Sequence, residues 1–247
     1  MRIILTGYTG HMGREVRACA EAAEGCEIVA GVDPMVPASD GICLKTFGEC
    51  TAEADVIIDF SHHSMTKELL DFAEARKLPV VLATTGQTAE EKERIVEAAG
   101  KIPVFLAANY SLCIATLTDL VRRAAALYPD AEIEIVEQHH DRKLDAPSGT
   151  ALALFNAVKE VRPEAEANCG RSGQGKRTKN EIGIHAIRMG NIVGVHEVMI
   201  GTQNERISLK HEAFSRGVFA EGSLKAAAFL MGKAPGIYDM KDLLRGV

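Results

Sequence analysis

The chain has 247 residues, which suits one large or two modest domains, and its 47% hydrophobic and 25% charged residues are ordinary for a soluble globular protein. Its formal net charge of −6 leaves no basic surplus to neutralise phosphates, which argues against nucleic acid as the main partner. The longest run without a charged residue, 102–118, is too short for a membrane span and contains Pro103 and Asn109.

The cysteine pattern indicates a reducing compartment. The six cysteines form no C-x-x-C pair and no zinc spacing, so we expect small core residues without disulfides or a metal. An apolar run begins at residue 2 and leaves no room for a signal peptide. We therefore expect a cytoplasmic protein. The cysteines are Cys19, Cys26, Cys43, Cys50, Cys113 and Cys169.

The first 33 residues have the order of a dinucleotide site. An apolar run, 2–6, leads into three glycines, a helical segment at 14–23 and a second apolar run, 28–32, that ends at Asp33. The glycines would permit a tight turn, close approach to a pyrophosphate and close helix packing, while Asp33 would reach ribose hydroxyls. Because the spacing begins G-x-x-G and not G-x-G, the alternative is a structural glycine turn. The glycines are Gly7, Gly10 and Gly13.

Apolar runs continue to alternate with helical patterns up to residue 110. Thr88 and Glu91 have the spacing of a capping box at the start of one such helix. The alternation predicts a parallel sheet with helices on both faces, and ligands bind beyond the carboxyl ends of such strands. Two short loops, 84–86 and 107–110, lie at those ends. The expected strands are 55–60, 79–83 and 102–106, and the expected helices include 64–76.

The pattern changes after residue 110. A helix at 112–128 and an alternating strand at 132–136 are followed by a helix at 148–161. Three alternating strands then predict an antiparallel meander whose first turn, Gly190-Asn191, has hairpin composition. We therefore expect a doubly wound α/β nucleotide domain with an inserted α+β domain whose mixed sheet is largely antiparallel. The strands of the meander are 182–189, 192–200 and 205–211, and an Ala-rich helix follows at 218–231.

The segment 137–150 carries the densest set of chemical groups. His139, His140 and Lys143 are proton donors or cations near neutral pH. Pro147-Ser148-Gly149-Thr150 runs into an apolar helical pattern, and a helix N-terminus binds carboxylate or phosphate readily. These groups together predict a site for a small acidic substrate. The alternative is a basic loop followed by a Ser-capped helix.

Six motifs occur in one order along the chain. They are Gly7-x-x-Gly-x-Met-Gly13, Ala83-Thr-Thr-Gly86, Ala107-Ala-Asn-Tyr-Ser111, His139-His-x-x-Lys-x-Asp-Ala-Pro-Ser-Gly-Thr150, Arg188-x-Gly-x-Ile-Val-Gly-x-His196 and Pro235-Gly-Ile-Tyr-Asp-Met240. Together they resemble the dihydrodipicolinate reductase family, also called 4-hydroxy-tetrahydrodipicolinate reductase, of the bacterial and plant lysine–diaminopimelate pathway. The match spans essentially the whole chain, and the His-His-Lys element is highly specific. The resemblance implies a Rossmann-type domain, 1–110 with 216–247, and a substrate-binding and oligomerisation domain, 111–215, whose sheet builds a homotetramer.

The resemblance also implies an activity. Such an oxidoreductase would reduce the cyclic imine dihydrodipicolinate, a dicarboxylate formed from 4-hydroxy-tetrahydrodipicolinate, to tetrahydrodipicolinate with NADH or NADPH. His139 matches the family's proton donor, and Lys143 matches its second essential group. Carboxylate-binding positions are matched by His140, Gly149 and Thr150, and no metal spacing emerges. The positions that match cofactor-binding loops are Gly7, Tyr8, Thr9, Gly10, His11, Met12, Asp33, Ala83, Thr84, Thr85, Ala107, Ala108, Asn109 and Tyr110.

Three positions depart from the better-known family pattern. Ala83 and Tyr110 stand where many relatives have Gly and Phe, which are mild changes in cofactor loops. Pro34 follows Asp33 where relatives that use NADPH well often place an arginine for the 2′-phosphate, and the segment 34–45 looks short. Because Asp33 repels a 2′-phosphate that has no neighbouring cation, we expect NADH to be preferred over NADPH.

Two other functions would share some of these features. A nucleotide-responsive sensor or scaffold without chemistry would keep the glycine loop and Asp33 but would not need His139 and Lys143. Another two-domain NAD(P)-dependent dehydrogenase, for amino acids or aldehydes, would not need the paired histidines or the Pro-Ser-Gly-Thr segment.

The remaining basic groups have simpler interpretations. The Gly-rich basic segment 171–179 lacks aromatic residues, which favours a mobile loop that could close over an anionic ligand. His62 and His63 lie at a strand end near the expected cofactor, and His196 could support either the fold or the site. Sheet faces are expected for His185 and His211.

Overall fold

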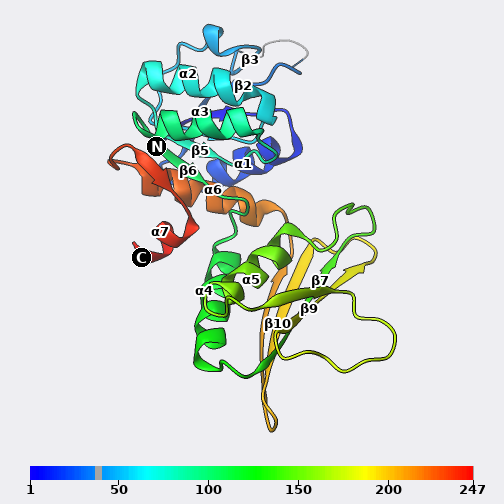
Figure 1. The fold of residues 1–247 in the computed structure, drawn as a ribbon. Helices are drawn as coiled ribbons and strands as arrows, with labels where there is room; N and C mark the ends of the chain where they lie inside the picture. Colours follow the sequence, from blue (N-terminus) through cyan, green and yellow to red (C-terminus); the bar gives the residue numbers. More distant parts are fainter. Residues whose placement is uncertain (37–40, 247) are drawn as a thin grey trace. The chain divides into compact units, whose positions relative to one another are not determined.

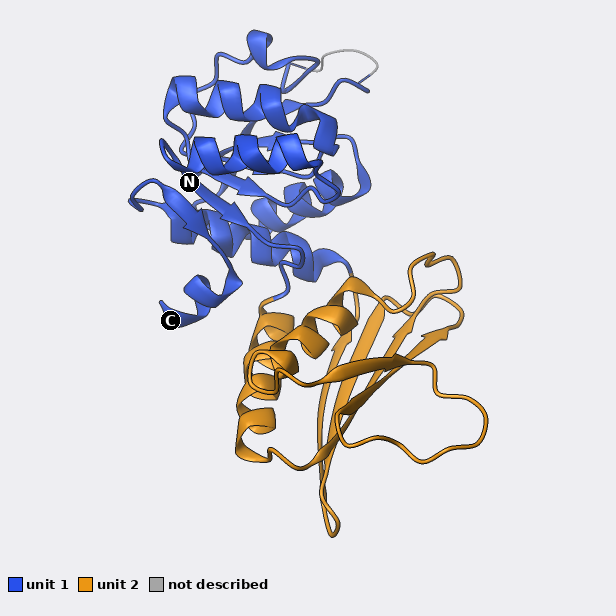
Figure 2. Cartoon of the chain, viewed as in Figure 1, with its two compact units in different colours: residues 1–111, 216–247 blue, residues 112–215 orange. Residues whose placement is uncertain are grey.

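The structure, a computed structural model, describes residues 1–36 and 41–246. The chain divides into two compact units (Figure 2): unit 1 comprises Met1–Ser111 and Arg216–Val247, and unit 2 comprises Leu112–Ser215. The chain therefore leaves unit 1 once and returns to it. The segment 34–45, which looks short in the sequence, includes residues 37–40, and these lie outside the described residues. Within the described part, no helix combines the length and apolar character that a membrane crossing needs.

Unit 1 is built on a seven-stranded sheet. Its strands are β1 (Arg2–Thr6), β2 (Glu27–Val32), β3 (Cys43–Leu44), β4 (Val56–Asp59), β5 (Val80–Leu82), β6 (Pro103–Leu106) and β12 (Gly236–Tyr238). They pair in parallel in the order β3-β2-β1-β4-β5-β6-β12, so the strand order reverses direction between β1 and β4. Such a reversal leaves a crevice at the carboxyl ends of the two strands, where ligands bind in sheets of this kind. The predicted Rossmann-type sheet is confirmed.

Helices cover both faces of this sheet (Figure 1). They are α1 (His11–Ala22), α2 (Thr66–Arg76), α3 (Ala89–Ala99) and α6 (Gly217–Leu230). The helices α2 and α3 pack together on the face that carries Ile4, Ile57 and Val80, while α6 packs on α1 and on β4, β5 and β6. Burial on both faces explains why these strands are continuous apolar runs. The predicted capping box of Thr88 and Glu91 is confirmed at the start of α3.

Unit 2 combines a five-stranded mixed sheet with two helices. The strands are β7 (Glu132–His139), β8 (Glu166–Cys169), β9 (Glu181–Arg188), β10 (Gly194–Gly201) and β11 (Arg206–Ala213), in the order β11-β10-β7-β9-β8. The ladders of β10 with β11 and β7 are antiparallel and hold more residue pairs than the parallel ladders of β9 with β7 and β8. The mixed, largely antiparallel sheet is therefore confirmed. The helices α4 (Leu112–Leu127) and α5 (Gly149–Lys159) pack together on the face that carries Ile133, Ile135 and Val198.

The hairpin predicted at Gly190-Asn191 is wrong. The strands on either side of this turn, β9 and β10, do not pair, because β7 lies between them. Gly190 does have a left-handed φ of 53°, but the turn crosses the end of β7. There the amide of Met189 donates to the His139 carbonyl (2.9 Å), and the amide of Asp141 donates to Gly190 (3.2 Å). Turn composition identifies a reversal of the chain but not the strand that fills the space beside it.

Several elements differ from the sequence expectation. The strands β3, β8 and β12 and the helix α7 (Met240–Arg245) were not predicted, because segments of two to six residues are too short to show a period. Strand β7 is longer than expected and includes His139. The cysteines of the described chain are all free, but the expectation that they lie in the core is wrong for Cys113 and Cys169, which are exposed.

Candidate active site

The loop between β1 and α1 allows close approach of backbone to a ligand. Gly7 has a φ of 73°, and a Cβ there would lie 2.3 Å from the carbonyl oxygen of Phe60, just after β4. A Cβ on Gly13 would lie 2.3 Å from the carbonyl oxygen of Gly7, so the first turn of α1 packs directly on the loop. Gly10 is the N-cap of α1 and is exposed. These residues therefore fit a dinucleotide whose pyrophosphate lies at the N-terminus of α1.

Asp33 follows β2 and is fixed by the same loop. Its Oδ2 accepts hydrogen bonds from the amide (2.9 Å) and the hydroxyl (2.5 Å) of Thr9, and its Oδ1 accepts one from the Met35 amide (2.9 Å). Burial acts to raise the pKa of the Asp33 carboxyl, but these hydrogen bonds outweigh burial and lower the pKa. The carboxylate is therefore ionised at neutral pH. Since a carboxylate has about four acceptor positions, about one remains for a ribose hydroxyl while Thr9 stays in place.

Two arginines flank the glycine loop. Arg14 donates from Nη1 to the carbonyl of Thr9 (3.2 Å), the residue whose amide and hydroxyl bind the Asp33 carboxylate. The guanidinium of Arg17 lies over the ring of Tyr8 at 4.2 Å from its centroid. Tyr8 is 8% exposed and packs under that cation, so its ring supports the loop.

The loops after β5 and β6 hold the other predicted cofactor positions. The hydroxyl of Thr84 is buried and has no hydrogen-bond partner in the described part of the chain. Tyr110 is 3% exposed, and its hydroxyl lies 2.9 Å from the Leu82 carbonyl and 3.1 Å from the Phe105 carbonyl. Its side chain therefore ties β5 to β6. Exposed or half-buried positions are His11, Met12, Ala83, Thr85, Ala107, Ala108 and Asn109.

The two histidines after β4 are held within unit 1. His63 Nδ1 lies 3.0 Å from both carboxylate oxygens of Glu91 on α3, and His62 Nδ1 lies 3.0 Å from the Ser64 hydroxyl. The centroids of the two rings are 4.2 Å apart, and the ring planes are tilted by 40°. In the described residues, no group of histidine, cysteine and carboxylate side chains could hold a metal ion.

In unit 2 the predicted catalytic groups gather at the carboxyl end of β7. His139 is the last residue of β7 and is 9% exposed. Lys143 lies in the loop that follows, with Nζ 2.8 Å from Asp145 Oδ1, and its charge acts on His139. His140 is half-buried, with an Nδ1 that has no hydrogen-bond partner among the described residues. Gly149, the first residue of α5, is exposed, and a Cβ there would meet nothing within 4 Å.

Glu137 and Arg188 hold this group together, and sequence reasoning assigned them no role. Glu137 is 0% exposed, and its carboxylate lies 2.6 Å from His139 Nδ1. Arg188 binds the same carboxylate through both terminal nitrogens and also donates to the Asp145 carbonyl (2.6 Å). A signal was present in the alternation of β7, because Glu137 occupies an inward position after Ile133 and Ile135. A carboxylate at such a position needs a partner.

His196 packs against His139 and the N-cap of α5. Its ring packs edge-on against His139, with centroids 5.1 Å apart, and its Nε2 lies 3.1 Å from the hydroxyl of Ser148, the N-cap of α5. Its Nδ1 is buried and has no hydrogen-bond partner in the described part of the chain. Burial is the main cause that lowers the pKa of His196 to about 4, and the charge of His139 adds to it. His196 is therefore neutral at physiological pH.

The basic segment 171–179 is tied down at two arginines. Arg171 pairs with Glu181, and Arg177 pairs with Glu134 and binds the carbonyl of Glu181. Both arginines therefore pair with carboxylates of the unit 2 sheet.

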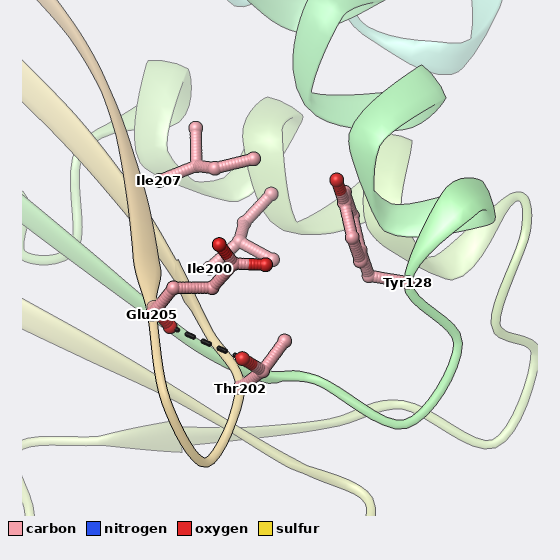
Figure 3. A pocket seen from close by; sticks show the side chains of 5 residues that line it. All are labelled: Tyr128, Ile200, Thr202, Glu205 and Ile207. Atoms are coloured by element: carbon pink, nitrogen blue, oxygen red, sulfur yellow. Dashed lines mark hydrogen bonds between the residues drawn. The ribbon is translucent and has the colours of Figure 1, made fainter.

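A small hollow lies at the tip of the β10–β11 hairpin, away from these groups (Figure 3). There the ring of Tyr128 faces Ile200 and Ile207, and the Thr202 hydroxyl bonds to the Glu205 carbonyl. Ile200 pairs with Ile133 at the opposite end of β7 from His139, roughly 20 Å away. The hollow therefore has no part in the chemistry of the His139 cluster.

Known families and proteins match both units. The model of the N-terminus of dihydrodipicolinate reductase matches residues 1–110, and that of its C-terminus matches residues 113–244. Curated 4-hydroxy-tetrahydrodipicolinate reductases of Clostridium tetani (strain Massachusetts / E88) and Caldanaerobacter subterraneus subsp. tengcongensis are each 46% identical over 247 residues. Both alignments cover 99% of this chain, with 97% and 98% of the respective relatives.

Solved structures share the fold. A dipicolinate-bound dihydrodipicolinate reductase from Paenisporosarcina sp. TG-14 has a TM-score of 0.82 at 25% identity, with 97% of each chain covered. A myo-inositol dehydrogenase from Corynebacterium glutamicum ATCC 13032 has a TM-score of 0.62 at 16% identity, with 99% of this chain and 92% of that chain covered. Fold alone therefore does not separate these activities. Because two family models and full-length relatives agree, the chain belongs to the dihydrodipicolinate reductase family, oxidoreductases of lysine and diaminopimelate biosynthesis with a nucleotide-binding Rossmann domain.

Proposed function

We propose that this chain performs the family's reduction of dihydrodipicolinate to tetrahydrodipicolinate with His139 as proton donor and Lys143 as the cation beside the imine. The observation that carries the proposal is that three kinds of group meet at one end of unit 2. A buried histidine ends β7, a lysine follows in the next loop, and the exposed Gly149 opens α5. A non-catalytic sensor or scaffold would not need this arrangement.

The proposed roles follow from the chemistry of an imine. Reduction adds a hydride and a proton to neighbouring atoms of the conjugated ring, and negative charge develops toward the ring nitrogen. A bound NADH would supply the hydride. His139 would deliver the proton from Nε2, since its Nδ1 is held by Glu137. Lys143 would stabilise the developing charge, and His140 and the first turn of α5 would orient the substrate through a carboxylate. Gly149 and Thr150 are the first two residues of that turn.

The activity test uses purified protein, NADH and enzymatically generated 4-hydroxy-tetrahydrodipicolinate. We expect NADH to be oxidised with this substrate and not with simple 2-oxo acids. A sensor or scaffold would oxidise no NADH with any of these compounds. A different dehydrogenase would oxidise NADH faster with a 2-oxo acid. Either result would contradict the proposal.

Recognition of two carboxylates predicts which inhibitors bind. Pyridine-2,6-dicarboxylate is expected to compete with substrate, as dipicolinate is bound in the Paenisporosarcina structure. Pyridine-2-carboxylate should inhibit roughly tenfold more weakly or worse, because one charge-assisted hydrogen bond is lost. Inhibition constants for the two compounds check this. Equal constants would mean that only one carboxylate is recognised.

Cofactor choice depends on Asp33, which we propose favours NADH. The ionised Asp33 repels a 2′-phosphate, and Pro34 offers neither a charge nor an N–H. Arg14, which donates to the Thr9 carbonyl, would offset only part of this repulsion. We therefore expect kcat/KM to favour NADH by a factor on the order of ten. Pro34→Arg should raise kcat/KM for NADPH, whereas Lys45→Arg, a control without added charge, should not. A parent enzyme that prefers NADPH, or no gain from Pro34→Arg, would contradict the argument.

We also propose a homotetramer built through the sheet of unit 2. The helices α4 and α5 cover one face of this sheet. The other face carries Ile187, which pairs with Gln138, and Met199, which pairs with Glu134. Apolar groups on an uncovered sheet face favour a second copy of the sheet as partner. Light scattering at micromolar concentration should give four times the chain mass of 26.6 kDa, and a single chain mass would contradict the proposal.

A cytoplasmic location belongs to the same proposal. The described cysteines are free, which suits a reducing compartment. Cell fractionation that finds the protein outside the cytoplasm would contradict it.

A further inference from the structure

Strand β7 carries a buried carboxylate, Glu137, which the steps above use only as a contact. Glu137 shares the helix-covered face of β7 with Ile133, Ile135 and His139. Removal of a carboxylate from water is unfavourable unless its acceptor positions are filled. The contacts of the Glu137 side chain therefore indicate its role.

Four donors fill the two oxygens of Glu137. Oε2 lies 2.6 Å from His139 Nδ1 and 2.7 Å from Arg188 Nη1. Oε1 lies 2.9 Å from the Ser148 amide and 2.8 Å from Arg188 Nη2. Each oxygen thus binds one arm of the same guanidinium and one group of the candidate site. A bidentate guanidinium fixes the plane of the carboxylate as well as its position.

We infer that Glu137 is a positioning residue of the reduction: it fixes the tautomer and orientation of His139 and links that ring to the first turn of α5. The inference rests on the proposed role of His139 as proton donor. An ionised carboxylate only accepts hydrogen bonds, so Nδ1 carries a hydrogen and Nε2 is the nitrogen that delivers a proton. Gly194 leaves room beside that atom, since a Cβ there would lie 3.1 Å from Nε2. Ser148 is the N-cap of α5, so the same carboxylate also places Gly149.

The charges around His139 show why its protonated form needs Glu137. Burial lowers the pKa of His139, and the charges of Lys143 and Arg188 lower it further, whereas Glu137 raises it. His196, which packs on the ring, is neutral and supplies no compensating charge. Loss of the Glu137 charge should therefore lower the pKa of His139. The imidazolium, and with it the activity, would then be lost at a lower pH as pH rises.

The direct test is Glu137→Gln, which keeps the shape and removes the charge. We expect kcat to fall on the order of 10- to 100-fold, the usual effect of losing the partner that orients a histidine. The alkaline limb of the kcat profile should move down by about one pH unit, while KM for NADH stays unchanged. A 15N NMR titration, with His139 assigned by its absence in His139→Gln, should show the same fall in pKa without any turnover. If Glu137 had only a structural role, neither the alkaline limb of the kcat profile nor the pKa of His139 in the NMR titration would change.

Glu134→Gln is the matched control. Glu134 lies three residues earlier on β7 and also contacts a histidine, His185 (2.9 Å), and an arginine, Arg177, but on the opposite face. We expect the titration of His139 and the pH profile to match the parent. The mass of the Glu134→Gln variant by light scattering is compared with that of the parent, because this face of the sheet is the proposed tetramer interface.

Glu137→Asp keeps the charge but shortens the reach, so it decides the question if the Gln variant fails to fold. We expect a fall in kcat with a smaller pKa change for His139 than in the Gln variant. Parent-like kcat and titration in either folded variant would overturn the inference. If His139→Ala is inactive in that case, only the positioning role fails. If His139→Ala is active, the proposed role of His139 as proton donor is wrong, and the positioning role fails with it.

Discussion

Replacing His139 by Ala is expected to lower kcat by roughly 10²- to 10⁴-fold, the usual weight of a positioned proton donor. Lys143→Ala should reduce kcat to a similar degree, since it removes a charge that would stabilise the transition state. NADH affinity should barely change, because both residues belong to unit 2 and the glycine loop and Asp33 belong to unit 1. Steady-state kinetics at saturating substrate and a fluorescence titration of NADH measure the two effects separately.

Matched controls are present in the same unit. His185 pairs with Glu134 on the other face of β7, and the side chain of Lys179 is 82% exposed. His185→Ala and Lys179→Ala should both keep parent turnover. A His139→Ala enzyme that retains more than about half of the parent kcat would remove that residue from the mechanism.

Acidification is expected to destabilise the protein through His196 by about 3 kcal/mol between pH 6.5 and pH 4. The pKa of His196 is lowered from 6.5 to about 4 by burial, so the folded chain keeps the ring neutral in this window. The unfolded chain binds a proton there, which favours unfolding as pH falls. The contribution of His196 is therefore complete above about pH 6.5 and is lost as pH falls toward 4.

The measurement is the free energy of unfolding by urea at several pH values and one protein concentration. His196→Gln, whose amide can still reach the Ser148 hydroxyl, should flatten the pH dependence in this window. His11→Gln, at an exposed position, should leave it unchanged. Because His139 and His211 also have lowered pKa values, the difference between parent and His196→Gln is the quantity to compare. Identical slopes for the two proteins would contradict the assignment.

Both predictions concern one structural device, a carboxylate and a neutral histidine placed around the proposed proton donor. Burial acts to raise the pKa of Glu137, but the hydrogen bonds from Arg188, His139 and Ser148 together outweigh burial, so that carboxyl is ionised. Glu137 then favours the protonated form of His139 against burial, while the more deeply buried His196 stays neutral. Burial lowers the pKa of both histidines, whose rings are 5.1 Å apart, but only His139 contacts a carboxylate that opposes this effect.

The sequence by itself determined the features that depend on local spacing. The glycines at 7, 10 and 13 specify the turn and the close packing of α1, because a Cβ at Gly7 or Gly13 would overlap neighbouring backbone. The apolar runs of the first 110 residues predicted the parallel sheet, since strands buried on both faces have no polar side. The capping box of α3 and the Ser148 N-cap of α5 follow from residues three apart. Each of these features is decided within a few neighbouring residues.

The tertiary structure alone decided which distant residues meet. The alternation in β7 placed Glu137 on the inner face, but no spacing showed that Arg188, on β9, would bind it. That contact exists because β9 pairs with β7 in parallel. The hairpin composition at 190–191 had instead predicted that β9 would pair with β10. Strand order is settled by how the whole sheet buries its apolar face under α4 and α5, which is a property of the assembled unit. The partners of His139 were therefore hidden from the sequence, although His139 itself was not.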